Sequence, residues 1–76
     1  MEKIFGQILK ELREQIGVTQ ETLALNSELD RTYISLLERG LRKPTVATLF
    51  KMAPTLKKNP SEIIAILEKK MDENRA

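Results

Sequence analysis

The strongest constraint on the fold lies between Thr19 and Gly40, where two helix-start signals occur eleven residues apart. Thr19 and Asp30 are residue types that cap helix N-termini, and a short run with apolar periodicity follows each of them. Gly40 is suited to end the second run in a left-handed conformation. The break between the two runs is too short to link two domains. The stretch therefore predicts two short helices joined by a tight turn.

Apolar spacing predicts a helix on each side of this pair. Residues 2–16 carry apolar side chains at helical spacing, and Gly17 follows where a helix commonly ends. A further helix begins after Thr45 and reaches about Leu56. Pro54 lies inside that range and lacks a backbone donor, so we expect the helix to kink or end just before it.

The last helix has the clearest start signal in the chain. Asn59 is suited to cap it, Pro60 occupies the first helical position, and Glu62 stands at the third. The apolar pattern continues to about Met71, and residues 72–76 are a polar tail that we expect to fray. The pattern as a whole predicts an all-α fold of five helices.

Composition limits the function classes. The 76 residues are enough for one small domain, which we place at residues 1–71, and there is no cysteine and no histidine. Disulfides, thiolate zinc sites and the commonest general base are therefore excluded, and we expect no enzyme activity, no metal and no cofactor. No apolar run approaches a membrane span, so we expect a cytoplasmic protein that does not bind membranes. A small core favours oligomerisation as a further source of stability.

The positive charge is concentrated near the second short helix. The net charge is only +2, but four basic residues lie between positions 31 and 43 against one acidic residue, Glu38. Such a local excess fits a polyanionic partner, and an ordinary solvated helix face would give the same pattern.

The second short helix has an outer face with the chemistry of a DNA reader. If Ile34 and Leu37 face the core, the opposite face carries Arg31, Thr32, Ser35 and Leu36, bordered by Tyr33 and Arg39. Arginine can bond two acceptors on guanine, hydroxyl groups can bond bases or phosphates, and apolar atoms can contact a thymine methyl group. A polar surface helix with no partner remains the alternative on these residues alone.

The last helix is apolar over a wider face than one core requires. Four neighbouring helices are expected to cover two or three of Ile63, Ile64, Ile66 and Leu67, and Phe50 can join the uncovered part. We expect a symmetric homodimer through Phe50, Ile63, Ile66 and Leu67, with burial of all of them in the core as the alternative.

Taken together, these residues resemble the Xre-type helix-turn-helix family, whose fold is that of the lambdoid phage repressors. The resemblance covers residues 4–67 approximately and rests on Gly6, Leu12-Arg13, Gly17-Val18-Thr19-Gln20-Glu21, Leu23-Ala24, Tyr33-Ile34-Ser35, Leu37-Glu38-Arg39-Gly40 and Pro44. The segment L-D-R-T-Y-I-S-L-L-E-R-G is most similar to the controller proteins of restriction–modification systems. The resemblance implies a lambda-repressor-like DNA-binding domain with its helix-turn-helix at about residues 19–39.

The resemblance also implies a role for individual residues. Base reading in the major groove of double-stranded DNA falls to Arg31, Thr32, Ser35, Tyr33 and Leu36. Tyr33 would reach a base or a backbone phosphate, and only apolar contact is available to Leu36. Phosphate contacts fall to Gln20, Thr19, Arg39, Arg42 and Lys43. Arg13 and Glu38 match a family pair that forms a largely buried salt bridge. The family often has glycine in the turn where this chain has Glu28, which predicts strain of about 1 kcal/mol if that residue adopts a positive φ.

The expected function is that of a transcriptional regulator. One recognition helix reads too few base pairs to find a single site, so we expect a dimer on a near-palindromic operator, with two helices roughly 34 Å apart. We expect no small-molecule ligand, and control by protein concentration. The resemblance favours a bacterial or phage-encoded controller protein. A phage or plasmid repressor, or an antitoxin-type interaction module with the same fold, remains the alternative.

Overall fold

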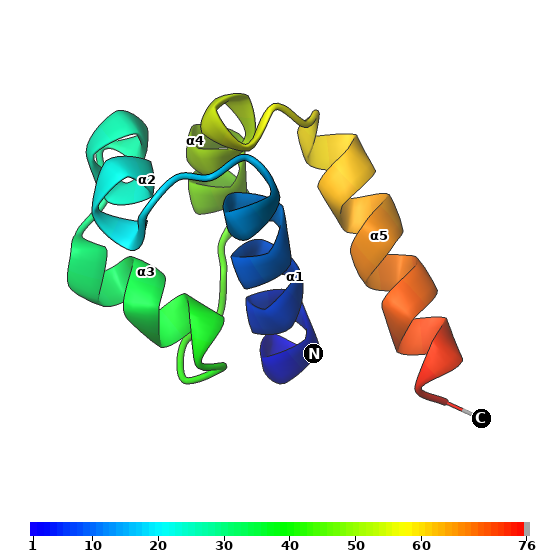
Figure 1. Ribbon diagram of the computed structural model, residues 1–76. Helices are drawn as coiled ribbons and strands as arrows, with labels where there is room; N and C mark the ends of the chain where they lie inside the picture. The colour runs from blue at the N-terminus through cyan, green and yellow to red at the C-terminus, as the bar shows by residue number, and fades with distance from the viewer. Residues whose placement is uncertain (76) are drawn as a thin grey trace.

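The chain is a bundle of five α-helices in the order that the apolar periodicity predicts. The computed structural model describes residues 1–75, and no strand occurs among them (Figure 1). The helices are α1 (Glu2–Gln15), α2 (Gln20–Ser27), α3 (Arg31–Glu38), α4 (Val46–Leu56) and α5 (Pro60–Glu73). The all-α, five-helix prediction is confirmed.

Local capping chemistry sets where the helices begin. The Thr19 hydroxyl accepts a hydrogen bond from the Thr22 main-chain N–H at 3.0 Å at the start of α2. The main-chain N–H of Asn59 donates to Glu62 Oε1 at 2.8 Å at the start of α5. Asp30 occupies the N-cap of α3, but its carboxylate forms no capping bond there. The side chains of Thr19 and Glu62 therefore act as their types and positions predict, and Asp30 supplies only its backbone.

Two non-glycine residues adopt left-handed backbone conformations at helix ends. Gly17 and Gly40 have φ values of 75° and 74°, as expected for residues that end helices. Glu28 follows α2 with a φ of 55°, and Lys57 follows α4 with a φ of 58°. The turn of the helix-turn-helix therefore requires the conformation that glycine adopts without strain, and Glu28 carries a cost of about 1–2 kcal/mol.

α4 continues through Pro54. The prediction that the helix could end just before this residue is therefore wrong. Helical geometry persists to Leu56, and the Lys57 N–H closes the end by donating to the Pro54 carbonyl at 3.1 Å. Because Pro54 has no N–H, the Phe50 carbonyl four residues earlier lacks its helical partner. Both residues lie on the exposed side of α4. Water can satisfy a carbonyl there, while the buried side of α4 holds the helix in place.

The C-terminal tail is shorter than predicted. α5 runs two residues past Met71, to Glu73, and Asn74 caps it. The ordered helix therefore includes the first two residues of the segment 72–76, and Ala76 lies outside the described residues.

The core lies where α1 to α4 meet, and α5 covers one side of it. Its buried apolar residues are Phe5, Ile8, Leu9, Leu12, Leu23, Ala24, Ile34, Leu37, Leu49, Met52, Ala53, Leu56 and Ile63. α5 contributes only Ile63 to this set. In Figure 1, α5 lies beside α1 on the side away from α3.

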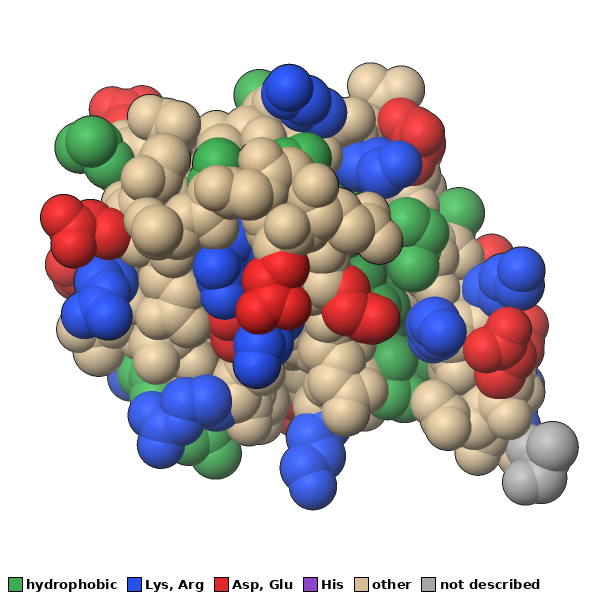
Figure 2. All heavy atoms as spheres, in the orientation of Figure 1, with side chains coloured by type: hydrophobic (Ala, Val, Ile, Leu, Met, Phe, Trp, Pro, Cys, Tyr) green, Lys and Arg blue, Asp and Glu red, His purple; other side chains and the backbone are tan. Residues whose placement is uncertain are grey.

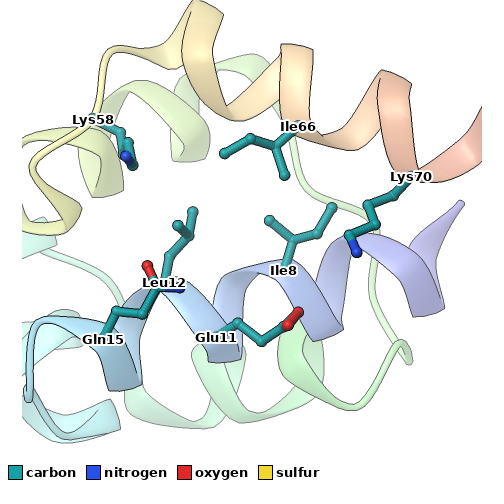
Figure 3. Close-up of a pocket in the computed structure, with 7 residues that line it drawn as sticks. All are labelled: Ile8, Glu11, Leu12, Gln15, Lys58, Ile66 and Lys70. Atoms are coloured by element: carbon teal, nitrogen blue, oxygen red, sulfur yellow. The ribbon is translucent and has the colours of Figure 1, made fainter.

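α5 leaves a groove against α1. Ile8 and Leu12 of α1 face Ile66 of α5 across it, and Lys58, in the loop before α5, and Lys70 of α5 reach toward it (Figure 3). The residues of α1 that line it lie on the opposite face of that helix from Gly6, which contacts α3. The groove is therefore separate from the helix-turn-helix. None of the described helices is both long and apolar enough to cross a membrane.

Candidate nucleic-acid interface

α3 presents a polar outer face over a fully buried inner one. Ile34 and Leu37 are inaccessible to solvent and hold the helix on the core. Arg31 and Thr32 are exposed in the first turn, while Ser35 and Leu36 are partly exposed one turn further on. The division follows from a 3.6-residue period with the two apolar residues three apart. The first turn of α3 is thus free to contact a partner.

A largely buried ion pair holds the end of α3 to α1. Arg13 Nε lies 2.6 Å from Glu38 Oε2, and Arg13 Nη2 lies 3.0 Å from Glu38 Oε1. The two side chains are only 12% and 4% exposed. The hydrogen bond to Glu38 raises the pKa of the Arg13 guanidinium above its ordinary value, although burial opposes this shift. The salt bridge that the family resemblance implies is present, and its geometry is bidentate.

Gln20 belongs to this ion-pair cluster, which differs from the predicted phosphate role. Its side-chain amide donates to Glu38 Oε1 at 3.0 Å, and Arg13 Nη1 donates to the Val18 carbonyl at 2.9 Å. The Gln20 amide nitrogen is therefore engaged within the protein. The Thr19 hydroxyl is engaged in the α2 cap. A phosphate at this helix end would meet main-chain N–H groups of the first turn of α2.

The Tyr33 hydroxyl bonds the loop after α3, which differs from its predicted contact with a base or a backbone phosphate. Its ring is partly buried and packs against the core. Its hydroxyl donates to the Lys43 carbonyl at 3.2 Å and lies 3.5 Å from Thr48 Oγ1. The sequence could not show this, because the acceptors lie ten and fifteen residues away. Tyr33 therefore joins α3 to the loop that follows it.

Basic side chains border the end of α3. Arg39, Arg42 and Lys43 are exposed in the segment between α3 and α4. Figure 2 shows Lys and Arg side chains along the lower edge of the molecule, where this segment and the start of α1 lie in Figure 1. Three of the five residues predicted to contact phosphate thus lie in one exposed segment.

Lys3 joins this basic edge, and sequence reasoning missed it. A Cβ placed on Gly40 would lie 3.0 Å from Cα of Lys3, so the start of α1 touches the residue that ends the recognition helix. Lys3 itself is exposed. Its position on α1 gave no signal by itself, because only the packing of α1 on α3 brings it there.

Gly6 allows that close packing. A Cβ on Gly6 would lie 2.6 Å from the Glu38 carbonyl oxygen and would also meet the Leu37 carbonyl oxygen. Both contacts involve backbone atoms, which cannot swing aside as a side chain can. α1 therefore braces α3 at two points, Gly6 and Arg13.

A separate apolar face lies across α4 and α5. Val46, Phe50 and Ile64 are between 49% and 72% exposed. Val46 and Ile64 line the same shallow hollows together with Leu49, and Leu67 lines one of these hollows. We call Val46, Phe50, Ile64 and Leu67 the apolar face.

Two residues predicted for a dimer interface lie outside the apolar face. Ile63 is only 2% exposed and belongs to the core, so it offers no surface to a second chain. Ile66 lines the groove between α1 and α5. Ile64, which follows Ile63, is exposed instead. The sequence showed that α5 was apolar over too wide a face, but not how the helix is rotated against its neighbours.

Comparisons with known proteins agree with this geometry. The profile of the helix-turn-helix family matches residues 9–63. The control protein C.MunI of a Mycoplasma species is 39% identical over 66 residues, covering 86% of this chain and 89% of that protein. The restriction–modification controller protein C.AhdI of Aeromonas hydrophila is 44% identical with a TM-score of 0.77, covering 80% of this chain and 92% of that one.

A third similar protein has been solved with DNA. It is the controller protein C.Esp1396I, as a tetramer on its natural 35 base-pair operator, 36% identical with a TM-score of 0.78 and 88% coverage of each chain. The family profile spans more than half of the sequence, and the relatives match over most of their own length. The chain therefore belongs to the Xre-type helix-turn-helix family, and its relatives include restriction–modification controller proteins.

Proposed function

We propose that this protein is a sequence-specific regulator of transcription that binds double-stranded DNA as a homodimer. The observation that carries the proposal is the outer face of α3. That face is exposed at Arg31 and Thr32, is braced from behind by a buried ion pair, and stands beside a basic edge. A rigid helix with free polar side chains and flanking cations is what major-groove recognition requires.

The first two turns of α3 supply the base contacts. Arg31 can bond the O6 and N7 atoms of a guanine through its fork of donors. Thr32 and Ser35 can bond bases or phosphates through their hydroxyl groups, and Leu36 offers an apolar surface to a thymine methyl group. These four side chains carry the sequence preference.

The basic edge supplies affinity that does not depend on sequence. Arg39, Arg42, Lys43 and Lys3 are exposed together near the end of α3. Each phosphate that they neutralise releases condensed counterions, so binding weakens as salt rises. The main-chain N–H groups at the start of α2 offer one further phosphate contact.

A second copy of the chain covers the apolar face. A small domain that exposes Val46, Phe50 and Ile64 as one patch is expected to bury it, and a two-fold axis lets the same patch cover itself. The two recognition helices then enter successive major grooves, roughly 34 Å apart. The near relative solved on its operator is described as a tetramer, which fits pairs of dimers on neighbouring half-sites.

In a controller protein this arrangement makes concentration the control variable. Dimerisation and the filling of adjacent sites both depend steeply on protein concentration, so a rising level switches promoter activity without a small-molecule signal. The similarity to named controller proteins supports this role, in which the protein regulates its own promoter and that of a neighbouring nuclease gene.

Selection of bound duplexes from a random pool tests the proposal. We expect enrichment of a near-palindrome with two half-sites about one helical turn apart. Bound duplexes that share no common sequence, or no retention of duplex DNA at low salt, would refute sequence-specific DNA binding. A protein-interaction module would then be the remaining use of the fold.

A further inference from the structure

The hydroxyl group of Tyr33, on the recognition helix α3, bonds the loop between α3 and α4. The Tyr33 hydroxyl lies 3.2 Å from the Lys43 carbonyl oxygen and 3.5 Å from Thr48 Oγ1. A phenol has one proton to donate, and the shorter distance assigns it to Lys43. Since the ring also packs against the core, the hydroxyl is presented to the loop from a fixed position.

The loop has bonded ends and a middle with few constraints. At its start the Leu41 N–H donates to the Leu36 carbonyl at 2.9 Å, which ends α3. At its end the Thr45 N–H donates to Thr48 Oγ1 at 2.9 Å, which begins α4. Between these points, among residues 1–75, the bond from Tyr33 is the hydrogen bond that reaches the backbone of Arg42 and Lys43.

The bonded carbonyl precedes a proline, which extends the effect of the bond. Lys43 is followed by Pro44, so its backbone is already restricted to extended conformations. Fixing its carbonyl oxygen therefore fixes the direction in which the Lys43 side chain leaves the loop. The Tyr33 hydroxyl also lies beside Thr48 in the first turn of α4, the helix on which Val46 begins the apolar face.

We propose that Tyr33 is a positioning residue for DNA binding, which acts by holding the Arg42–Lys43 loop at a set distance from the base-reading face of α3. The proposal rests on the proposed function. Tyr33 itself contacts no base: it orders the loop before DNA arrives, so the phosphate contacts form without a further loss of backbone freedom. Its effect is therefore the same for every DNA sequence.

Tyr33→Phe is the informative variant, because it removes one hydroxyl and keeps the buried ring. The Lys43 carbonyl that it releases is in an exposed loop, where water can replace the bond, so the melting temperature is expected to stay unchanged. Operator and random duplexes are both expected to bind on the order of threefold to tenfold more weakly, since one neutral hydrogen bond no longer orders the loop.

A double-mutant cycle separates positioning from direct contact. In an Arg42→Ala/Lys43→Ala background the added Tyr33→Phe change is expected to have almost no effect, because the side chains that it positions are gone. Ser35→Ala is the matched control: its effect on operator binding is expected to persist in that background, because Ser35 acts on the DNA directly.

Each contrary outcome overturns the proposal in a distinct way. Full additivity in the cycle assigns the hydroxyl to a phosphate, and a changed preference at one operator position assigns it to a base. Wild-type affinity of Tyr33→Phe removes any role in DNA binding. Failure of the wild-type protein to bind any duplex would instead refute the proposed function.

A measurement without DNA tests independently whether the bond from Tyr33 to the Lys43 carbonyl orders the loop. Backbone ¹⁵N order parameters at Arg42 and Lys43 are expected to fall in Tyr33→Phe relative to wild type, while those at Leu41 and Thr45 stay unchanged. Equal values at Arg42 and Lys43 in both proteins would overturn the proposal, even if DNA binding itself were lost.

Discussion

Glu38 at the end of the recognition helix is bonded to Arg13, 25 residues earlier, through both of its carboxylate oxygens, at 2.6 and 3.0 Å. The pair is almost sealed from solvent. Because it joins α1 to α3, it fixes the orientation of the helix that we propose to read DNA.

Glu38→Ala is expected to lower the free energy of unfolding by about 3–5 kcal/mol, because it leaves the Arg13 charge buried without its partner. Urea unfolding followed by circular dichroism measures this loss. Glu68→Ala, which removes an exposed carboxylate from α5, is the control and should cost less than about 1 kcal/mol. Equal losses of unfolding free energy in the two variants would show that the ion pair does not stabilise the fold.

Gly6→Ala tests the second brace, and two physical effects predict opposite signs. Helix propensity favours alanine by up to about 1 kcal/mol. The added Cβ would meet backbone oxygen atoms of Leu37 and Glu38, which we expect to cost about 1–3 kcal/mol or more and to displace α3. Thermal unfolding should therefore show a less stable protein. A more stable one would mean that α1 and α3 are not in such close contact.

Glu28→Gly is expected to stabilise the fold by about 1 kcal/mol, because the turn holds this residue at a φ of 55°. The measurement is the urea midpoint at constant slope. Glu21→Gly, inside α2, should have the opposite effect by a similar amount. A lower midpoint for Glu28→Gly would show that the glutamate side chain contributes more than its backbone strain costs.

Ile64→Asp is expected to convert the dimer to a folded monomer, because it places a charge in the middle of the apolar face. Sedimentation velocity at micromolar concentration reports the change. Ala65→Asp introduces the same charge at an exposed position one residue along α5 and should leave the dimer intact. A wild-type protein that sediments as a monomer at high concentration would contradict the dimer.

The features that the sequence predicted well are those that local chemistry decides. Thr19 and Asn59 begin helices because their own neighbours supply the hydrogen bonds, and Gly17 and Gly40 end helices because of their own backbone freedom. Pro54 shows the limit of local rules, since burial on the other side of α4 outweighs its missing donor.

The parts of the site that the sequence could not predict depend on distances between helices. Tyr33 and Gln20 have side chains suited to DNA contact, but each finds a protein partner ten or more residues away. Lys3 reaches the basic edge only because α1 crosses α3 at a glycine. Whether Ile63 or Ile64 faces outward depends on the rotation of α5 against the core.

In the proposed function, α3 reads bases through Arg31. Arg31→Ala is expected to weaken operator binding by roughly 1–3 kcal/mol and to relax the preference at one base pair of each half-site. Arg31→Lys is the matched control, because it keeps the charge and loses the fork of donors. It should bind random DNA as the wild type does, with an unchanged salt dependence, and still lose operator preference.

The direct measurement is a fluorescence-anisotropy titration of wild type and both Arg31 variants with operator and random duplexes at one fixed salt concentration. We expect the ratio of operator to random affinity to fall in both variants, and the affinity for random DNA to fall only in Arg31→Ala. Equal affinity of Arg31→Ala and wild type for both duplexes would contradict this expectation.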